Sequence, residues 1–170
     1  MQRHLLYLPF ALQIFGVMAI SMIVPSLYAL VTEQFFEARM FFYTGLLGVT
    51  FLALIGLARS NQTTRETALD QMLSLALLFV FLPVFLAIPG YSVIRTTSFL
   101  NAYLDMVSAL TTTGFEVFPA SRLSDSVHLW RALVGWMGGA LIWVAAVAIL
   151  APLNLGGFEL TAQHANARRQ

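Results

Sequence analysis

The chain alternates long apolar stretches with short polar connections. Four stretches lack any charged residue, and they run from Leu5 to Thr32, Met40 to Ala58, Gln71 to Ile94 and Ala132 to Phe158. Each is near or above the roughly 18 residues that a helix needs to cross a bilayer. The pattern therefore predicts four transmembrane helices, the first of them kinked at Pro25.

Composition supports a lipid environment for the whole chain. Of its 170 residues, 59% are hydrophobic and 10% are charged, against roughly 25% charged residues in a soluble domain. We therefore expect an all-α integral membrane protein. The net charge of +1 is spread without any run of like charges, and this excludes a nucleic-acid interface of the usual basic kind.

The sequence gives no support for an enzyme, a cofactor or a catalytic metal. The chain has no cysteine, and its histidines, His4, His128 and His164, are far apart. No histidine or carboxylate pair stands at a spacing typical of metal ligands. An even number of spans places both termini on one side, and the distribution of arginines favours the cytoplasmic side.

A fifth apolar piece, Phe99 to Leu110, lies between the third and fourth spans. Twelve residues form a helix of about 18 Å, too short for a hydrocarbon core of about 30 Å. The piece can enter the membrane but cannot cross it, so we predict a re-entrant helix. Thr96, Thr97 and Ser98 supply oxygens to cap its start, and Gly114 marks the place where the chain turns back.

The re-entrant helix ends in the run Thr111-Thr112-Thr113-Gly114. A helix C-terminus carries about half a negative charge and favours a cation nearby. Backbone carbonyls and threonine hydroxyls after it can replace the water ligands of an ion, and glycine permits the positive φ that turns successive carbonyls toward one axis. An ordinary exposed loop is the alternative. A single strand cannot enclose an ion, so a filter needs several such strands around one axis.

The residues from Phe99 to Gly114 closely resemble the first pore loop of the Trk/Ktr/HKT potassium-uptake proteins. The run Gly135-Trp136-Met137-Gly138-Gly139 is similar to the second pore-lining helix of that family. The first two apolar stretches resemble the additional helix pair of its TrkH branch. The resemblance implies an organisation of two accessory transmembrane helices plus one repeat of helix, re-entrant pore loop and helix.

The family translocates potassium through four such repeats, of which this chain holds one. The resemblance implies that Thr111, Thr112 and Thr113 donate carbonyls to the filter and that Gly114 favours potassium. It also implies further pore repeats as partners, a homodimer of full-length subunits and a cytoplasmic nucleotide-binding regulatory subunit. The resemblance places the transporter itself in the inner membrane. Two departures stand out: Ala109 replaces a frequent glycine, and Phe115-Glu116 follows Gly114 where small or hydroxyl residues are expected.

Several residues near the filter have two interpretations. Asp105 is an ionisable group in a membrane segment, and we expect it to brace the filter, in an ion pair with Arg131. Glu116 either raises the cation concentration at the outer vestibule or is an ordinary solvated carboxylate. The glycines Gly135, Gly138 and Gly139 include a Gly-x-x-x-Gly spacing, which predicts close packing between repeats, with a gating hinge as the alternative.

The predicted division of the chain follows from these elements. Residues 1–64 form the accessory helix pair, 65–160 the pore repeat with its pore helix at about 99–110 and filter at 111–114, and 161–170 a polar cytoplasmic tail. Because the family continues where this tail stands, we expect a fragment of a longer transporter. A non-conducting assembly subunit and a self-assembling homotetrameric cation channel are the alternatives.

Overall fold

The computed structural model describes residues 10–59 and 68–167, with side-chain surroundings for 11–58 and 73–147. This part of the chain is helical and contains no strand. The elements are α1 (Phe10–Ser21), α2 (Ile23–Val31), α3 (Phe35–Arg59), α4 (Ala68–Ile94), α5 (Phe99–Leu110), the short 3-10 helix η2 (Ala120–Arg122) and α6 (Asp125–Ala167). The prediction of an all-α integral membrane protein is confirmed.

Four helical stretches are long and apolar enough to cross a membrane, as the hydrophobic pattern predicts. They are Ala11–Val31, Phe35–Ala58, Leu73–Ile94 and Asp125–Val147. The first comprises α1 and α2, which are separated at Met22. Pro25 has no N–H to donate to the Ser21 carbonyl, so the helical ladder is interrupted one turn before the proline. The predicted kink is therefore present, at the position that proline chemistry requires.

The last helix differs from its prediction at both ends. α6 begins at Asp125, seven residues before the predicted start at Ala132, because an acidic residue is favourable in the first turn of a helix. A search for charge-free stretches excludes Asp125 and Arg131 and so misses this turn. At the other end α6 continues to Ala167, so residues 161–167 of the predicted tail are helical. Residues 168–170 and the predicted domain boundary at 64/65 lie outside the described residues.

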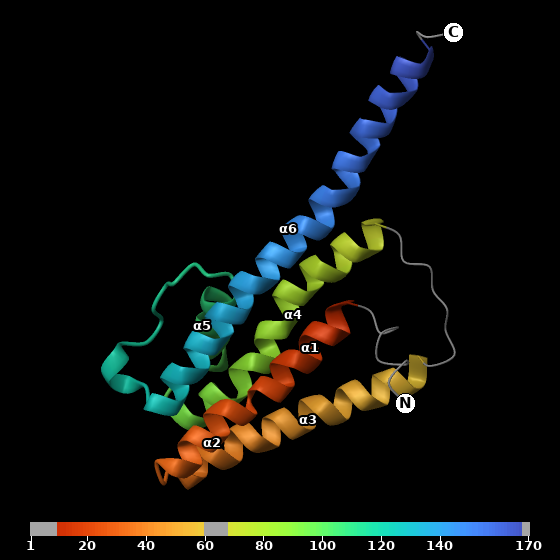
Figure 1. Ribbon diagram of the computed structural model, residues 1–170. Coiled ribbons are helices and arrows are strands. Elements are labelled where there is room, and N and C mark those ends of the chain that lie inside the picture. The colour runs from red at the N-terminus through yellow and green to blue at the C-terminus, as the bar shows by residue number, and fades with distance from the viewer. Residues whose placement is uncertain (1–9, 60–67, 168–170) are drawn as a thin grey trace.

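The helices form a bundle in which α1, α2 and α3 pack beside α4 and the first part of α6 (Figure 1). Trp130 lies at the junction and is fully buried. Its indole Nε1 donates to the Leu86 carbonyl of α4 at 3.1 Å, and its ring meets Phe41 of α3 edge-on with centroids 6.0 Å apart. One side chain of α6 thus joins the accessory helices to the pore repeat.

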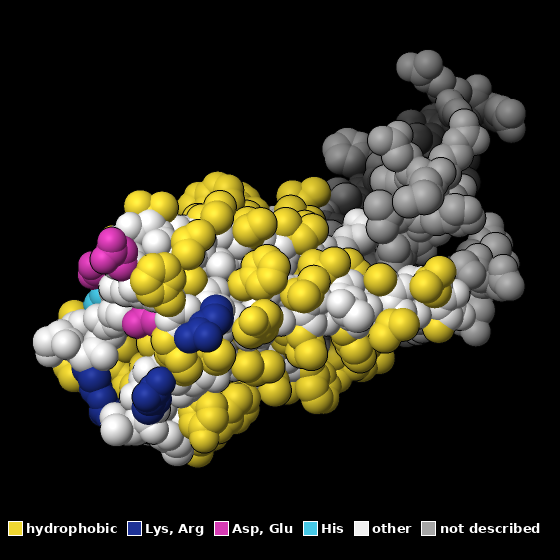
Figure 2. All heavy atoms as spheres, turned by 90° about the horizontal axis from the view of Figure 1, so that it is seen from below, with side chains coloured by type: hydrophobic (Ala, Val, Ile, Leu, Met, Phe, Trp, Pro, Cys, Tyr) yellow, Lys and Arg dark blue, Asp and Glu magenta, His cyan; other side chains and the backbone are white. Residues whose placement is uncertain are grey.

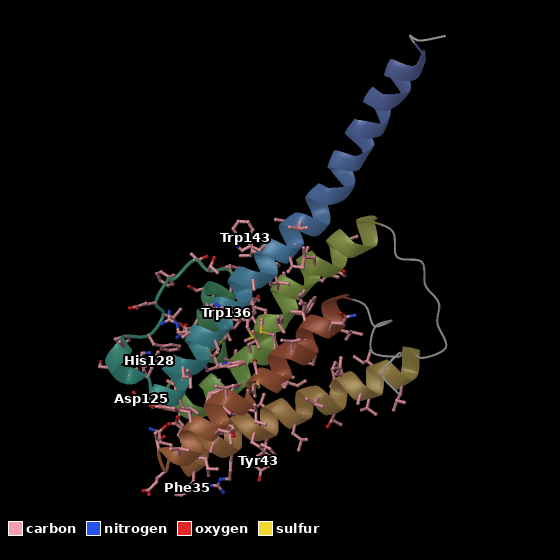
Figure 3. All side chains as sticks on the ribbon, viewed as in Figure 1. Phe35, Tyr43, Asp125, His128, Trp136 and Trp143 are labelled. Carbon is pink, nitrogen blue, oxygen red and sulfur yellow. The ribbon has the colours of Figure 1, made fainter. Side chains whose placement is uncertain are left out.

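The surface of the bundle is apolar along the helices and charged at one end. Figure 2 shows hydrophobic side chains along the helices, with arginine and acidic side chains clustered at one end. Phe35, Asp125 and His128 lie at this same end (Figure 3). Large apolar side chains point outward, and Trp136 and Trp143 are each 76% exposed. Such a surface suits the hydrocarbon of a bilayer.

Candidate functional site

Helix α5 reaches half-way into the bundle and stops there. Its first residues are capped by Ser98, whose Oγ accepts a hydrogen bond from the Asn101 N–H at 3.3 Å. Its bounds, Phe99–Leu110, agree with the predicted pore helix. At its far end Leu110 lies against Gly138, near the middle of the 23-residue stretch Asp125–Val147. The C-terminus of α5 therefore lies beside the middle of a helix that is long and apolar enough to cross a membrane.

The chain after α5 returns to the side from which the helix entered. Arg122, in η2, donates through Nη2 to the Thr96 carbonyl at 2.5 Å and to the Thr96 hydroxyl at 2.6 Å. Thr96 precedes α5, and Arg122 lies 26 residues later. These bonds join the entry and the exit of the loop, so the chain leaves the bundle at the end at which it enters.

The turn at the tip is built from hydrogen bonds that point back into α5. The N–H groups of Thr111 and Thr112 donate to Val107 and Ala109, at 2.9 and 3.0 Å. The N–H groups of Thr113 and Gly114 both donate to the Ser108 carbonyl, at 3.0 and 3.4 Å. Gly114 has φ +75°, as the sequence predicts, and Thr112 also has a positive φ of 56°, which the sequence does not predict.

The carbonyl oxygens of this turn face away from the protein's own donors. Within the described residues, no hydrogen bond reaches the carbonyls of Thr111, Thr112, Thr113 or Gly114, and the last three residues are exposed. The hydroxyl groups behave differently. Thr111 Oγ1 donates to the Val107 carbonyl at 2.8 Å and lies 2.8 Å from Thr113 Oγ1. The unpaired acceptors of the tip are therefore carbonyls, while two of the three hydroxyls hold the turn together.

A polar network behind the tip fixes its outer half. The Phe115 carbonyl accepts hydrogen bonds from Ser108 Oγ at 2.8 Å and from Arg131 Nη2 at 3.1 Å. Arg131 Nε also lies 3.2 Å from Asp105 Oδ1, and the Asp105 side chain is 3% exposed. The predicted ion pair is confirmed. Arg131 also makes a contact that was not predicted, because its guanidinium bridges α5 to the backbone that follows Gly114.

The glycines of α6 bring this helix against the end of α5. A methyl group at Gly138 would overlap the Leu110 carbonyl oxygen and lie 2.8 Å from its carbonyl carbon. The same addition at Gly135 or Gly139 meets only ordinary contacts, 3.6 Å from the Ala109 oxygen and 3.7 Å from Thr112 Cγ2. The close approach to α5 of the same repeat is thus made by Gly138, whereas Gly135 and Gly139, the two members of the Gly-x-x-x-Gly spacing, have room for a side chain. The packing between repeats stays a prediction.

Glu116 is exposed on the loop after the tip, and both interpretations of its role stand. A second carboxylate, Glu37 of α3, was not singled out from the sequence. Its Oε2 accepts a hydrogen bond from Ser124 Oγ at 2.7 Å and another from Ser126 Oγ. These bonds tie the start of α3 to the start of α6, and thereby tie the accessory pair to the pore repeat at the loop's end of the bundle.

The chain is similar in sequence to several Trk system potassium uptake proteins. It is 40% identical over 83 residues to the Trk system potassium uptake protein TrkI of Halomonas elongata, covering 48% of this chain and 16% of the relative. It is 27% identical over 142 residues to the TrkH protein of Escherichia coli, covering 82% of this chain and 29% of the relative. The chain spans less than a third of the length of these curated relatives. No family model and no solved structure matches it.

Proposed function

We propose that this chain, a relative of the TrkH and TrkI potassium uptake proteins, supplies one quarter of a potassium selectivity filter through Thr111 to Gly114. One observation carries the proposal: every N–H of this turn donates into α5, and its four carbonyls accept no hydrogen bond from the described residues. Carbonyl oxygens that are free, close together and in a low-dielectric setting are the ligands that strip water from potassium.

The position of the turn at the end of α5 gives an electrostatic reason for it to bind a cation. The C-terminus of α5 points at the turn from within the membrane, and its macrodipole places about half a negative charge there. Asp105 and Arg131 form a nearly neutral pair behind the loop, 3.2 Å apart, so the pair fixes the loop without cancelling this field. The turn therefore attracts a cation at the depth where an ion is otherwise least stable.

A complete filter requires partners for this loop. The exposed side of Thr112, Thr113 and Gly114 leaves an ion coordinated on one side only, whereas a dehydrated potassium ion is surrounded by carbonyls. We propose that the remaining pore repeats, on the same or other chains, close the ring. By analogy with the family, the full-length subunit would form a homodimer and bind a cytoplasmic nucleotide-binding regulatory subunit.

The proposed location is the inner membrane, with both termini in the cytoplasm. The filter loop then opens toward the outside, and Glu116 lies at the outer vestibule. Potassium would move inward, driven by the negative interior potential at about 2.3 kcal/mol per charge per 100 mV.

Potassium uptake in a deficient cell tests this function. The chain is expressed alone and also together with the missing repeats of the TrkH relative, and growth at micromolar potassium and uptake of rubidium are measured. We expect uptake only when the further repeats are present, and we expect loss of potassium preference with Gly114→Ser. Uptake with unchanged ion preference in Gly114→Ser would contradict the filter assignment.

A further inference from the structure

An apolar groove lies on the accessory side of the bundle, on the surface formed by α1, α3 and α4. Its volume is about 630 Å³, and its walls include Phe15, Tyr43, Gly48, Phe51, Leu54 and Phe85. No residue of α5 or of the filter loop lines it. From Tyr43 to Leu54 the groove follows α3 for about 16 Å, close to half of a hydrocarbon core of about 30 Å. The groove is therefore about as long as one leaflet is thick.

Gly48 of α3 allows the three helices to pack closely along one wall of the groove. A methyl group there would lie 2.5 Å from Cζ of Phe85 and 2.8 Å from Cβ of Ala19, so α3 could not stay this close to α1 and α4 with a side chain at this position. Its floor is aromatic: the Phe15 ring lies 4.7 Å from the Phe85 ring and 6.0 Å from the Phe51 ring, measured between centroids. Packed rings of this kind hold the shape of a groove when nothing occupies it.

The surroundings of the groove decide which molecule fills it. Its walls belong to the spans Ala11–Val31, Phe35–Ala58 and Leu73–Ile94, and Leu47 and Leu54 are each 61% exposed at its rim. At this depth the surrounding solvent is hydrocarbon. An acyl chain is the molecule with matching length and polarity.

The positively charged side chain of Arg39 lies toward one end of the groove. Arg39 is exposed and precedes Tyr43 by one turn on the same face of α3, about 6 Å along the axis. Its Nε donates to the Phe35 carbonyl at 3.2 Å, and its terminal amino groups bond to none of the described residues. Figure 3 shows Phe35 and Tyr43 toward the charged end of the bundle, where headgroups would lie. A guanidinium favours a phosphate with which it makes paired hydrogen bonds.

We propose that this groove binds one acyl chain of an anionic phospholipid, whose phosphate pairs with Arg39. Tyr43 lies between Arg39 and the rest of the groove, and a tyrosine is favourable at the boundary between hydrocarbon and headgroups. The bound lipid would fill the hollow over Gly48 and hold α1, α3 and α4 together. The site is independent of ion conduction, because no residue of the filter takes part in it.

Photolabelling of the purified full chain tests the proposal. The probe is phosphatidylglycerol with a diazirine in its acyl chain, and a phosphatidylcholine probe with the same chain is the comparison. Labelled peptides are mapped by mass spectrometry. We expect labelling concentrated between Tyr43 and Leu54 and around Phe85, with phosphatidylglycerol captured roughly fivefold better, as expected for one arginine near an anionic headgroup.

Two pairs of variants separate the groove from the general surface. Leu47→Trp fills the rim and should lower labelling of the groove, whereas Val49→Trp, on the opposite face of α3 and not part of the lining, should leave it unchanged. Arg39→Gln should abolish the headgroup preference. Arg95→Gln should retain it, because the Arg95 guanidinium is already held 4.3 Å over the Phe36 ring and Arg95 does not line the groove.

Three results would overturn the proposal. Labelling spread evenly over all apolar faces would mean that only bulk lipid contacts the groove. Equal labelling of the two tryptophan variants would exclude the groove as the binding site. A protein-to-protein crosslink through Tyr43 to Leu54 in membranes would show that a second chain covers it instead. Circular dichroism of each variant confirms that the comparison is made between folded proteins.

Discussion

Gly138 and Leu110 lie in backbone contact, with no room for a side chain between α6 and the end of α5. Leu110 is the last residue of α5, and the four residues of the candidate filter follow directly. The position of the candidate filter in the bundle therefore depends on a glycine of the neighbouring helix.

Gly138→Ala should displace the end of α5 and lower stability by about 1–3 kcal/mol, as overpacking does. The added methyl group would meet the Leu110 backbone, which cannot turn aside as a flexible side chain can. Thermal unfolding in detergent, followed by size-exclusion chromatography, measures the loss. Gly135→Ala is the matched control, because its methyl group would lie 3.6 Å from the nearest atom, an ordinary contact. Equal melting temperatures for the two variants would contradict the role of Gly138.

Gly114→Ala should strain the turn without any steric clash. No atom lies within 4 Å of a methyl group at this position, but φ is +75°, which costs a residue with a Cβ about 1–2 kcal/mol. The turn should relax and its carbonyls should lose their common direction, which binding of rubidium to the assembled transporter would report. Gly90→Ala also adds a methyl group in open space, but within a helix. It should be neutral or stabilising by up to about 1 kcal/mol.

The two members of the Asp105–Arg131 ion pair should contribute to stability together rather than separately. Asp105→Asn leaves the guanidinium without its partner, and Arg131→Gln leaves a carboxylate that is 3% exposed without a cation. Each single change should cost about 3–5 kcal/mol, and the double change should cost less than their sum. A double-mutant cycle on thermal stability measures this coupling. Additive losses would mean that the two side chains act separately.

Arg131→Lys tests the second contact of the same side chain. A guanidinium reaches both the Asp105 carboxylate and the Phe115 carbonyl, whereas a single ammonium group lacks the fork geometry that allows this. Most of the stability should remain while the loop after Gly114 becomes looser. Hydrogen exchange should therefore rise selectively in residues 111–117. Unchanged exchange there would show that the bond to Phe115 does not hold the loop.

Glu37→Gln should weaken the attachment of the accessory helices to the pore repeat. The carboxylate accepts hydrogen bonds from Ser124 and Ser126, and bonds to a charged acceptor contribute about 1.5–3 kcal/mol each. Limited proteolysis at the α2–α3 turn and thermal unfolding should both reveal the change. Glu33→Gln, an exposed carboxylate at the same turn, should have no effect. A similar response from both variants would indicate a loss of surface charge only.

Local sequence patterns predict the elements that depend on local chemistry. The spans follow from apolar length, and α5 follows from an apolar piece with a hydroxyl cap and a glycine beyond it. Asp105 and Arg131 could be paired because ionisable groups near the membrane interior need partners. The positive φ of Gly114 follows from the absence of a Cβ.

Contacts between distant segments could not be predicted in the same way. Glu37 and Ser124 are 87 positions apart, and the local sequence around either residue does not predict that they are in contact. The positive φ of Thr112 is imposed by the hydrogen bonds that fold the turn back onto α5. The partner of Gly138 depends on where α5 ends in space, and Gly138 lies outside the Gly135-x-x-x-Gly139 spacing that predicts close packing.

The ion preference of the assembled transporter tests the central claim most directly. The chain is combined with the missing repeats, reconstituted into vesicles, and compared with its Gly114→Ser variant for rubidium influx in competition with potassium and sodium. The account predicts that potassium competes much better than sodium in the parent protein, and that this difference is largely lost in the variant. Rubidium influx with the same preference for potassium in both proteins would contradict it.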